Sequence, residues 1–211
     1  AYEIYQCDWS SDVCSSDLDG STYYNRGNYA TLNPLSNVNT TLNSGNLYQY
    51  YAGSWSSALA TIGVTSGKWY MEAYAVAVVA TNYTIVGVAL QPWTTSVYLG
   101  NTSTSYGFQW SGSTSYKYYN GNGGVSVSTP GGTLSVGGIL QLAFDADTGN
   151  VWYGLNNTWA EGSPSAGTGA SHTVSPVPST GSVYFMGMSQ YGGNACSINF
   201  GQRSEEHTSE L

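Results

Sequence analysis

The stretch that decides the fold is ILQLAFDADTGNVWYGL, residues 139–155. Two runs rich in apolar residues, 139–145 and 150–155, flank a short segment of Asp, Thr, Gly and Asn. Asp and Asn accept hydrogen bonds from nearby backbone amides, and both tolerate left-handed backbone angles, which Gly adopts freely. The stretch therefore predicts an antiparallel hairpin. Alternation along its first strand predicts one apolar face, formed by Leu140, Leu142 and Phe144, and one more polar face, formed by Ile139, Gln141, Ala143 and Asp145.

The rest of the chain repeats this pattern at short spacing. Helical periodicity is nearly absent, and strand-like segments are separated by Gly, Asn, Pro and Ser, which is typical of a sandwich or barrel. The continuous apolar run 74–80 predicts a strand covered on both sides, and the Pro- and Ser-rich stretch 161–182 predicts a surface loop. The other predicted strands lie in 46–53, 58–80 (two strands about a turn at 65–67), 84–91, 105–112, 115–124, 182–192 and 195–201.

The two ends differ in composition from the body. Residues 203–211, RSEEHTSEL, match a translation of the start of a common sequencing adapter, and residues 1–18 match the indexed adapter read in the same way. We therefore expect both segments to be adapter-derived and to make few contacts with the body, and we expect the natural gene to extend beyond them. The net charge of −8 for the full chain falls to −2 over 19–202, where five acidic and three basic residues remain.

The composition of 19–202 excludes several classes of protein. The length suits one domain, with a lead-in and first strands in 19–57 and the sandwich in 58–202. Lys and Arg are too few for a nucleic-acid binder, and no apolar run is long enough to span a membrane. Cys196 and His172 are single in this region, so neither a disulfide framework nor a zinc site is expected. Many Tyr, Ser, Asn and Gly residues with little charge favour an uncharged binding surface.

Acidic residues could indicate catalysis, but their positions favour structural roles. Asp145 and Asp147 stand near a strand end, where paired carboxylates could serve a hydrolase. Their position in a hairpin favours a turn in which Asp147 accepts bonds from loop amides, and the spacing does not fit a calcium loop. Glu72 is expected to be a satisfied strand residue, paired with Lys68 across the sheet. We therefore expect no catalytic residues, no bound metal and no cofactor.

Several segments together resemble a known family. SGKWYMEAY (66–74), VGVAL (86–90), YGFQWSGSTSYKYYNG (106–121), the 139–156 hairpin, VYFMGMSQYGG (183–193) and INFGQ (198–202) occur in the order found in SPRY (B30.2-like) domains. The versions in bacteriophage and prophage virion proteins are the most similar. The resemblance implies an all-β, two-sheet antiparallel sandwich of the concanavalin-like type that binds through loops at one end and performs no chemistry.

The resemblance implies a receptor- or partner-recognition module of a phage tail fibre or another virion surface protein. Its partner would be a protein or glycan on a cell or virion surface, and its location would be the virion or the extracellular surface. Two alternatives stay open: a carbohydrate-active enzyme or lectin on a similar sandwich, and a structural spacer domain of a virion. Oligomeric state, host and ligand do not follow from the sequence.

Aromatic residues in predicted loops are the candidates for binding, because a ring offers an apolar face with a polar edge. Trp69, Trp152 and Tyr184 are instead expected in the core. The candidate binding residues are Trp93, Tyr98, Trp110, Tyr116, Tyr118, Tyr119 and Tyr191.

Overall fold

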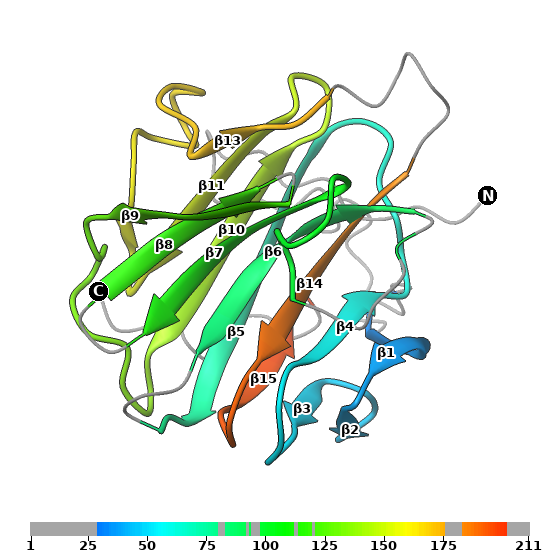
Figure 1. The fold of residues 1–211 in the computed structure, drawn as a ribbon. Coiled ribbons are helices and arrows are strands. Elements are labelled where there is room, and N and C mark those ends of the chain that lie inside the picture. The colour runs from blue at the N-terminus through cyan, green and yellow to red at the C-terminus, as the bar shows by residue number, and fades with distance from the viewer. Residues whose placement is uncertain are drawn as a thin grey trace, which may run out of the picture.

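A computed structural model describes residues 29–79, 83–91, 93, 98–111, 114–119, 121–175 and 183–201. The segments expected to be adapter-derived, 1–18 and 203–211, lie outside the described residues. Within the described ranges there is no helix, and antiparallel strands form two sheets that pack face to face (Figure 1). The prediction of an all-β, two-sheet sandwich is confirmed.

One sheet has seven strands and the other has eight. In the seven-stranded sheet the order is β1 (Leu32–Val38), β4 (Ser56–Ala60), β14 (Tyr184–Gln190), β6 (Thr84–Leu90), β7 (Ser105–Ser111), β8 (Thr114–Tyr119) and β9 (Asn122–Val127). In the eight-stranded sheet it is β12 (Thr158–Trp159), β11 (Asn150–Leu155), β10 (Ile139–Asp145), β5 (Lys68–Ala77), β15 (Ala195–Asn199), β3 (Tyr48–Tyr50) and β2 (Thr41–Asn43), with β13 (His172–Thr173) paired to β11.

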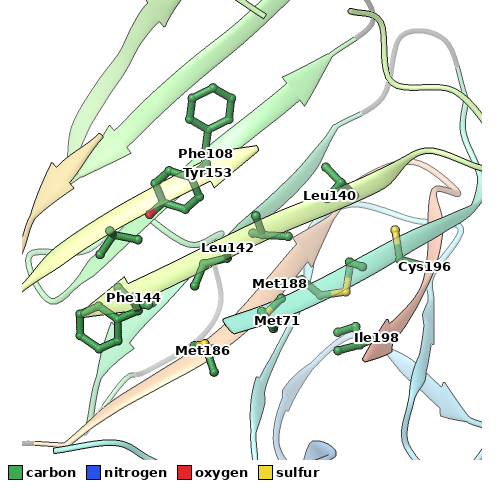
Figure 2. Packing of buried hydrophobic residues seen from close by; sticks show 14 of the residues in the cluster. Met71, Phe108, Leu140, Leu142, Phe144, Tyr153, Met186, Met188, Cys196 and Ile198 are labelled. Carbon is green, nitrogen blue, oxygen red and sulfur yellow. The ribbon is translucent and has the colours of Figure 1, made fainter. Parts of the chain in front are cut away.

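The core lies between the sheets and follows the alternation predicted from the sequence. Leu140, Leu142 and Phe144 of β10 point into it and are fully buried. Met186 and Met188 of β14 meet them from the seven-stranded sheet (Figure 2). Further side chains from both layers complete the cluster shown there: Met71, Phe108, Tyr153, Cys196 and Ile198. Antiparallel sheets that each present one apolar face are stabilised by burying those faces against each other.

Three local expectations need correction. The run 74–80 is not covered on both sides, because Tyr74 and Val76 of β5 are about two-fifths exposed, at 41% and 38%. The predicted polar face of β10 is not open either: Gln141, Ala143 and Asp145 are buried. The stretch 115–124 holds parts of two strands, β8 and β9.

The predicted surface loop 161–182 is also more ordered than expected over its described part, 161–175. Strand β13 pairs with β11 there, and Val174 is buried in the core. Trp152 Nε1 donates a hydrogen bond to the Thr168 carbonyl at 2.9 Å. The segment therefore covers the outer face of β11, because the large Trp152 ring on that face can be buried only beneath another piece of chain.

Candidate functional site

Six aromatic residues gather on the outer face of the seven-stranded sheet. Pairing opposes Tyr118 to Gly107 and Tyr116 to Gln109, whereas the intervening β7 residue, Phe108, points into the core. Side chains alternate along a strand, so Tyr116 and Tyr118 point away from the core. The members of this group, called here the aromatic surface, are Trp55, Tyr83, Tyr98, Tyr116, Tyr118 and Tyr191.

The rings of the aromatic surface form one continuous set of contacts. The Trp55 centroid lies 4.4 Å from that of Tyr98 and 5.3 Å from that of Tyr191. Tyr83 stacks on Trp55 at 5.7 Å and lies 5.6 Å from Tyr191. Tyr98 extends the set by a T-shaped contact to Tyr118 at 5.2 Å. Such offset and edge-to-face pairs at 4.5–7 Å are the favoured aromatic geometries, so the rings hold one another in place.

Backbone hydrogen bonds bring three of these residues together although they are far apart in sequence. Tyr191 N donates to the Tyr83 carbonyl at 2.9 Å, which continues the β14–β6 ladder beyond its last strand residue. Gly192 N donates to the Gly53 carbonyl at 3.1 Å, close to Trp55 in the chain. The surface therefore begins where β4, β6 and β14 meet at one end of the sheet.

A row of glycines lets residues 98–104, the described C-terminal part of the β6–β7 connection, pack closely on the same sheet. Gly187, Gly87 and Gly107 are in register on β14, β6 and β7. A Cβ on Gly107 would lie 2.7 Å from the Leu99 carbonyl oxygen, so only glycine allows this approach. Leu99 N donates to Ser189 Oγ at 3.0 Å, which fixes the connection and places the adjacent Tyr98 among the other rings.

A second apolar cluster holds the β6–β7 connection against the outer face of the seven-stranded sheet. Trp93 is only 6% exposed and packs with Leu59, Ile85, Ala89 and Leu99, outside the main core. Its Nε1 donates to Thr102 Oγ1 at 3.2 Å. Trp93 therefore anchors the connection instead of reaching outward.

The aromatic surface carries no charged member, and its Tyr118 hydroxyl stays protonated. Desolvation by burial raises the pKa of Tyr118, and the neighbouring Tyr98, Tyr116 and Tyr83 hydroxyls raise it further. A phenol with a raised pKa remains a neutral hydrogen-bond donor at physiological pH. The arrangement offers half-buried apolar ring faces with polar edges, which is suited to contact rather than to chemistry.

The structure groups four of the seven sequence-predicted residues and separates three. Tyr98, Tyr116, Tyr118 and Tyr191 belong to the aromatic surface. The expectation that Trp110 is a loop residue is wrong, because it lies on β7, faces the core and is fully buried. Trp93 is buried beneath the connection, and Tyr119 lies on the opposite face of β8, opposite Tyr106.

Sequence reasoning missed Trp55 and Tyr83. Each stands immediately before a strand, β4 and β6 respectively, and so continues the alternation of that strand by one position. Extending the alternation backwards places both on the side away from the core, which is the signal that could have found them.

The carboxylates near the hairpin turn accept hydrogen bonds from backbone amides and so have structural roles. Asp145 Oδ1 accepts from the amides of Asp147 and Thr148 at 3.0 and 3.2 Å, and Asp147 Oδ1 accepts from Gly67 N at 3.0 Å. The turn-stabilising role expected of Asp147 is therefore played by Asp145. Glu72 accepts a 2.6 Å hydrogen bond from the Tyr70 hydroxyl.

Removing the Asp145 carboxylate should lower stability without changing the fold. Because two backbone amides would lose their acceptor, we expect Asp145→Ala to reduce the free energy of unfolding by about 2 kcal/mol. Asp145→Asn keeps one acceptor oxygen and should cost about half as much. Urea denaturation of both variants measures the difference; an alanine variant as stable as the wild type would contradict this role.

His172 is buried beside aromatic rings, away from the aromatic surface. Desolvation by burial lowers the pKa of His172 to about 4, and the nearby Lys117 charge lowers it as well. The hydrogen bond to the Gly107 carbonyl and the Glu161 charge act in the opposite direction and raise the pKa. In the unfolded chain the histidine pKa is near 6.5. Between pH 6.5 and pH 4, therefore, the unfolded chain binds a proton at His172 and the folded protein does not. Stability is therefore expected to fall as the pH is lowered from about 6.5 to about 4.

This histidine gives a measurable pH dependence. At pH 5 the cost relative to pH 8 should be about 2 kcal/mol, with the His172→Gln variant lacking this contribution. Chemical denaturation of the wild type and of His172→Gln across this pH range isolates the contribution of His172 to the free energy of unfolding, because both proteins contain the same carboxylates. Parallel stability curves would show that His172 is accessible to protons in the folded state.

The described residues include potential metal ligands and one thiol, that of Cys196. No group of three or more His, Cys, Asp or Glu side chains lies together among the described residues. Burial raises the pKa of the Cys196 thiol to about 12, so this cysteine is an unreactive core residue. The described ranges also contain no helix that could cross a membrane.

Solved structures with the same architecture are known, although neither a family model nor a curated protein matches the sequence. The chain is similar to the SPRY domain of human HERC1, with a TM-score of 0.58 and 18% identity over 82% of this chain and 99% of that one. It is also similar to the PSpry domain of TRIM65, with a TM-score of 0.57 and 14% identity over 81% of this chain and 92% of that one. A human SPRY domain gives a TM-score of 0.59 and 13% identity over 80% of this chain and 99% of that one. The chain thus has the fold of a SPRY domain, as the resemblance in its sequence implied.

Proposed function

We propose that the protein is a non-enzymatic binding module that recognises a polypeptide through the aromatic surface. The observation that carries this proposal is the continuous contact of six rings, without a charged member, on one outer face of the sandwich. SPRY domains act as protein-interaction modules, and the shared fold supports the same role here.

The chemistry of the surface favours a polypeptide partner. Tyr and Trp supply large, rigid contact area at a low cost in conformational entropy, and they are enriched at binding hot spots. Trp55 is the centre of the group because it contacts Tyr83, Tyr98 and Tyr191. The close packing of Leu99 on the sheet, next to Tyr98, limits the rearrangement that binding would require, and a preorganised surface binds more tightly.

Selection from a random peptide display library tests the proposal. Peptides enriched on the wild-type protein should lose most of their affinity for Tyr98→Ala, because that ring joins Trp55 to Tyr118. Tyr74→Ala is the matched control, because Tyr74 is also exposed but lies on β5 of the other sheet. Peptides that bind Tyr98→Ala as well as they bind the wild type would reject the aromatic surface as the recognition site.

The biological setting that we propose is a virion or extracellular surface, with the domain acting in receptor or partner recognition on a phage tail fibre or similar structure. The uncharged, Tyr- and Ser-rich composition and the sequence resemblance to phage SPRY-like proteins support this setting. Fluorescently labelled protein should then bind intact bacterial cells of a susceptible strain. Tail or capsid genes beside the coding sequence on a longer contig would add support, and housekeeping genes in their place would count against it.

A further inference from the structure

A hollow of about 290 Å³ lies on the opposite face of β8 from the aromatic surface. Phe108, Lys117 and Val125 are register partners on the inner face of β7, β8 and β9. Phe108 is fully buried, the Lys117 side chain is 19% exposed and Val125 is 45% exposed. The covering of this face therefore decreases toward the sheet edge, and residues of β7, β8, β9 and β13 line the hollow.

Aromatic rings form much of the wall of the hollow. The His172 ring centroid lies 5.6 Å from those of Tyr106 and Tyr119, which also line the hollow, and 5.6 Å from that of the buried Tyr153. His172 Nε2–H donates to the Gly107 carbonyl at 3.4 Å, which fixes the ring and leaves Nδ1 as an acceptor. The walls are thus rigid and carry polar atoms at their edges.

The hollow has no net charge, and one of its polar groups has no partner. Lys117 Nζ lies 3.0 Å from both carboxylate oxygens of Glu161, so its charge is compensated. The Ser171 hydroxyl is buried and has no hydrogen-bond partner in the described part of the chain. A buried hydroxyl without a partner is costly, and because Ser171 lines the hollow, a molecule bound there is the natural source of the missing partner.

We propose that this hollow binds one neutral sugar residue, held against the Tyr106 and Tyr119 rings. Its volume is just below the range of ordinary small-molecule sites, about 300–1,000 Å³, and so suits a single ring rather than a chain of them. A sugar has an apolar face to lie on a ring and hydroxyl groups that both donate and accept. These match the Lys117 ammonium and the hydroxyls of Tyr119 and Ser171, which belong to lining residues of the hollow.

Other ligand classes fit less well. An anion would approach the Glu161 carboxylate, and a cation would approach the Lys117 ammonium, so neither gains net attraction from the compensated pair. An aliphatic ligand would cover the ion pair and the Ser171 hydroxyl without offering them hydrogen bonds. The sugar site lies on the inner face of β8 and is separate from the aromatic surface, so either proposal can fail alone.

NMR titration of the full chain with the methyl glycosides of glucose, galactose and N-acetylglucosamine tests the proposal. At least one glycoside should give saturable shift changes at the His172 imidazole and the Tyr119 ring, with a dissociation constant in the millimolar range. Tyr119→Phe keeps the ring but loses the hydroxyl, so its affinity should fall about fivefold. Tyr119→Ala should abolish the shift changes, and Tyr74→Ala on the other sheet should leave the affinity unchanged.

The controls separate a sugar site from its alternatives. Retained dispersion of core methyl signals shows that each variant is folded. The absence of saturable changes with all three glycosides would overturn the proposal, as would unchanged affinity in folded Tyr119→Ala. Equal shift changes with acetamide would overturn it in favour of a site for a carboxamide side chain.

Discussion

Gly107→Ala is expected to lower the free energy of unfolding by about 3 kcal/mol, because the added methyl group has no space. Its Cβ would lie 2.6 Å from Ile85 Cγ2 and 2.7 Å from the Leu99 carbonyl oxygen. The Leu99 backbone cannot move aside as a flexible side chain can, so the segment around Leu99 must lift from the sheet. Urea denaturation measures the loss of stability.

The same variant should also disturb the aromatic surface, since the lifted connection carries Tyr98 away from Trp55. A change in near-ultraviolet circular dichroism would report the loss of this ring contact, and peptide affinity should fall with it. Gly123→Ala is the matched control: Gly123 lies on β9 of the same sheet, is exposed and has no atom within 4 Å of an added Cβ. Equal stability of the two variants would contradict the proposed close packing over Gly107.

Trp55→Ala is expected to weaken the binding of peptides selected on the aromatic surface by about 2–4 kcal/mol, roughly 30- to 1,000-fold. Trp55 contacts three other rings, so its removal takes away the largest apolar face and also frees its neighbours to move. Isothermal titration calorimetry with the selected peptides measures the loss.

Two variants distinguish a lost contact from general damage. Trp55→Phe retains an aromatic ring and should recover part of the affinity. Trp159→Ala removes a partly buried tryptophan from β12 of the other sheet, where its ring lies 6.5 Å from that of Tyr70, and should leave the affinity unchanged. A Trp55→Ala variant that is folded and binds within about twofold of the wild type would rule out Trp55 as a hot spot.

Local sequence rules predicted most of the strands correctly. The hairpin strands 139–145 and 150–155 have the predicted boundaries, because their alternation and the Asp–Gly–Asn turn chemistry are properties of neighbouring residues. Among the strands that were missed are β1, which contains Pro34, and β9, which contains Gly123 and Gly124. Both are edge strands, where such residues are tolerated although they weaken the sequence pattern.

The sequence by itself determined the fold class, the main hairpin and the aromatic, nearly uncharged character of the protein, because alternation, turn residues and composition act locally. Only the tertiary structure decided which rings form a surface. Trp93 and Trp110 resemble Tyr98 and Tyr191 as aromatic residues near loops, yet the first two are buried and the others belong to the aromatic surface. For Trp110 the physical reason is that a one-residue difference in register turns a side chain to the opposite face of a strand, whereas Trp93 is buried by packing against Leu59, Ile85, Ala89 and Leu99. That register is set by pairing between segments far apart in the chain, such as β4 with β14.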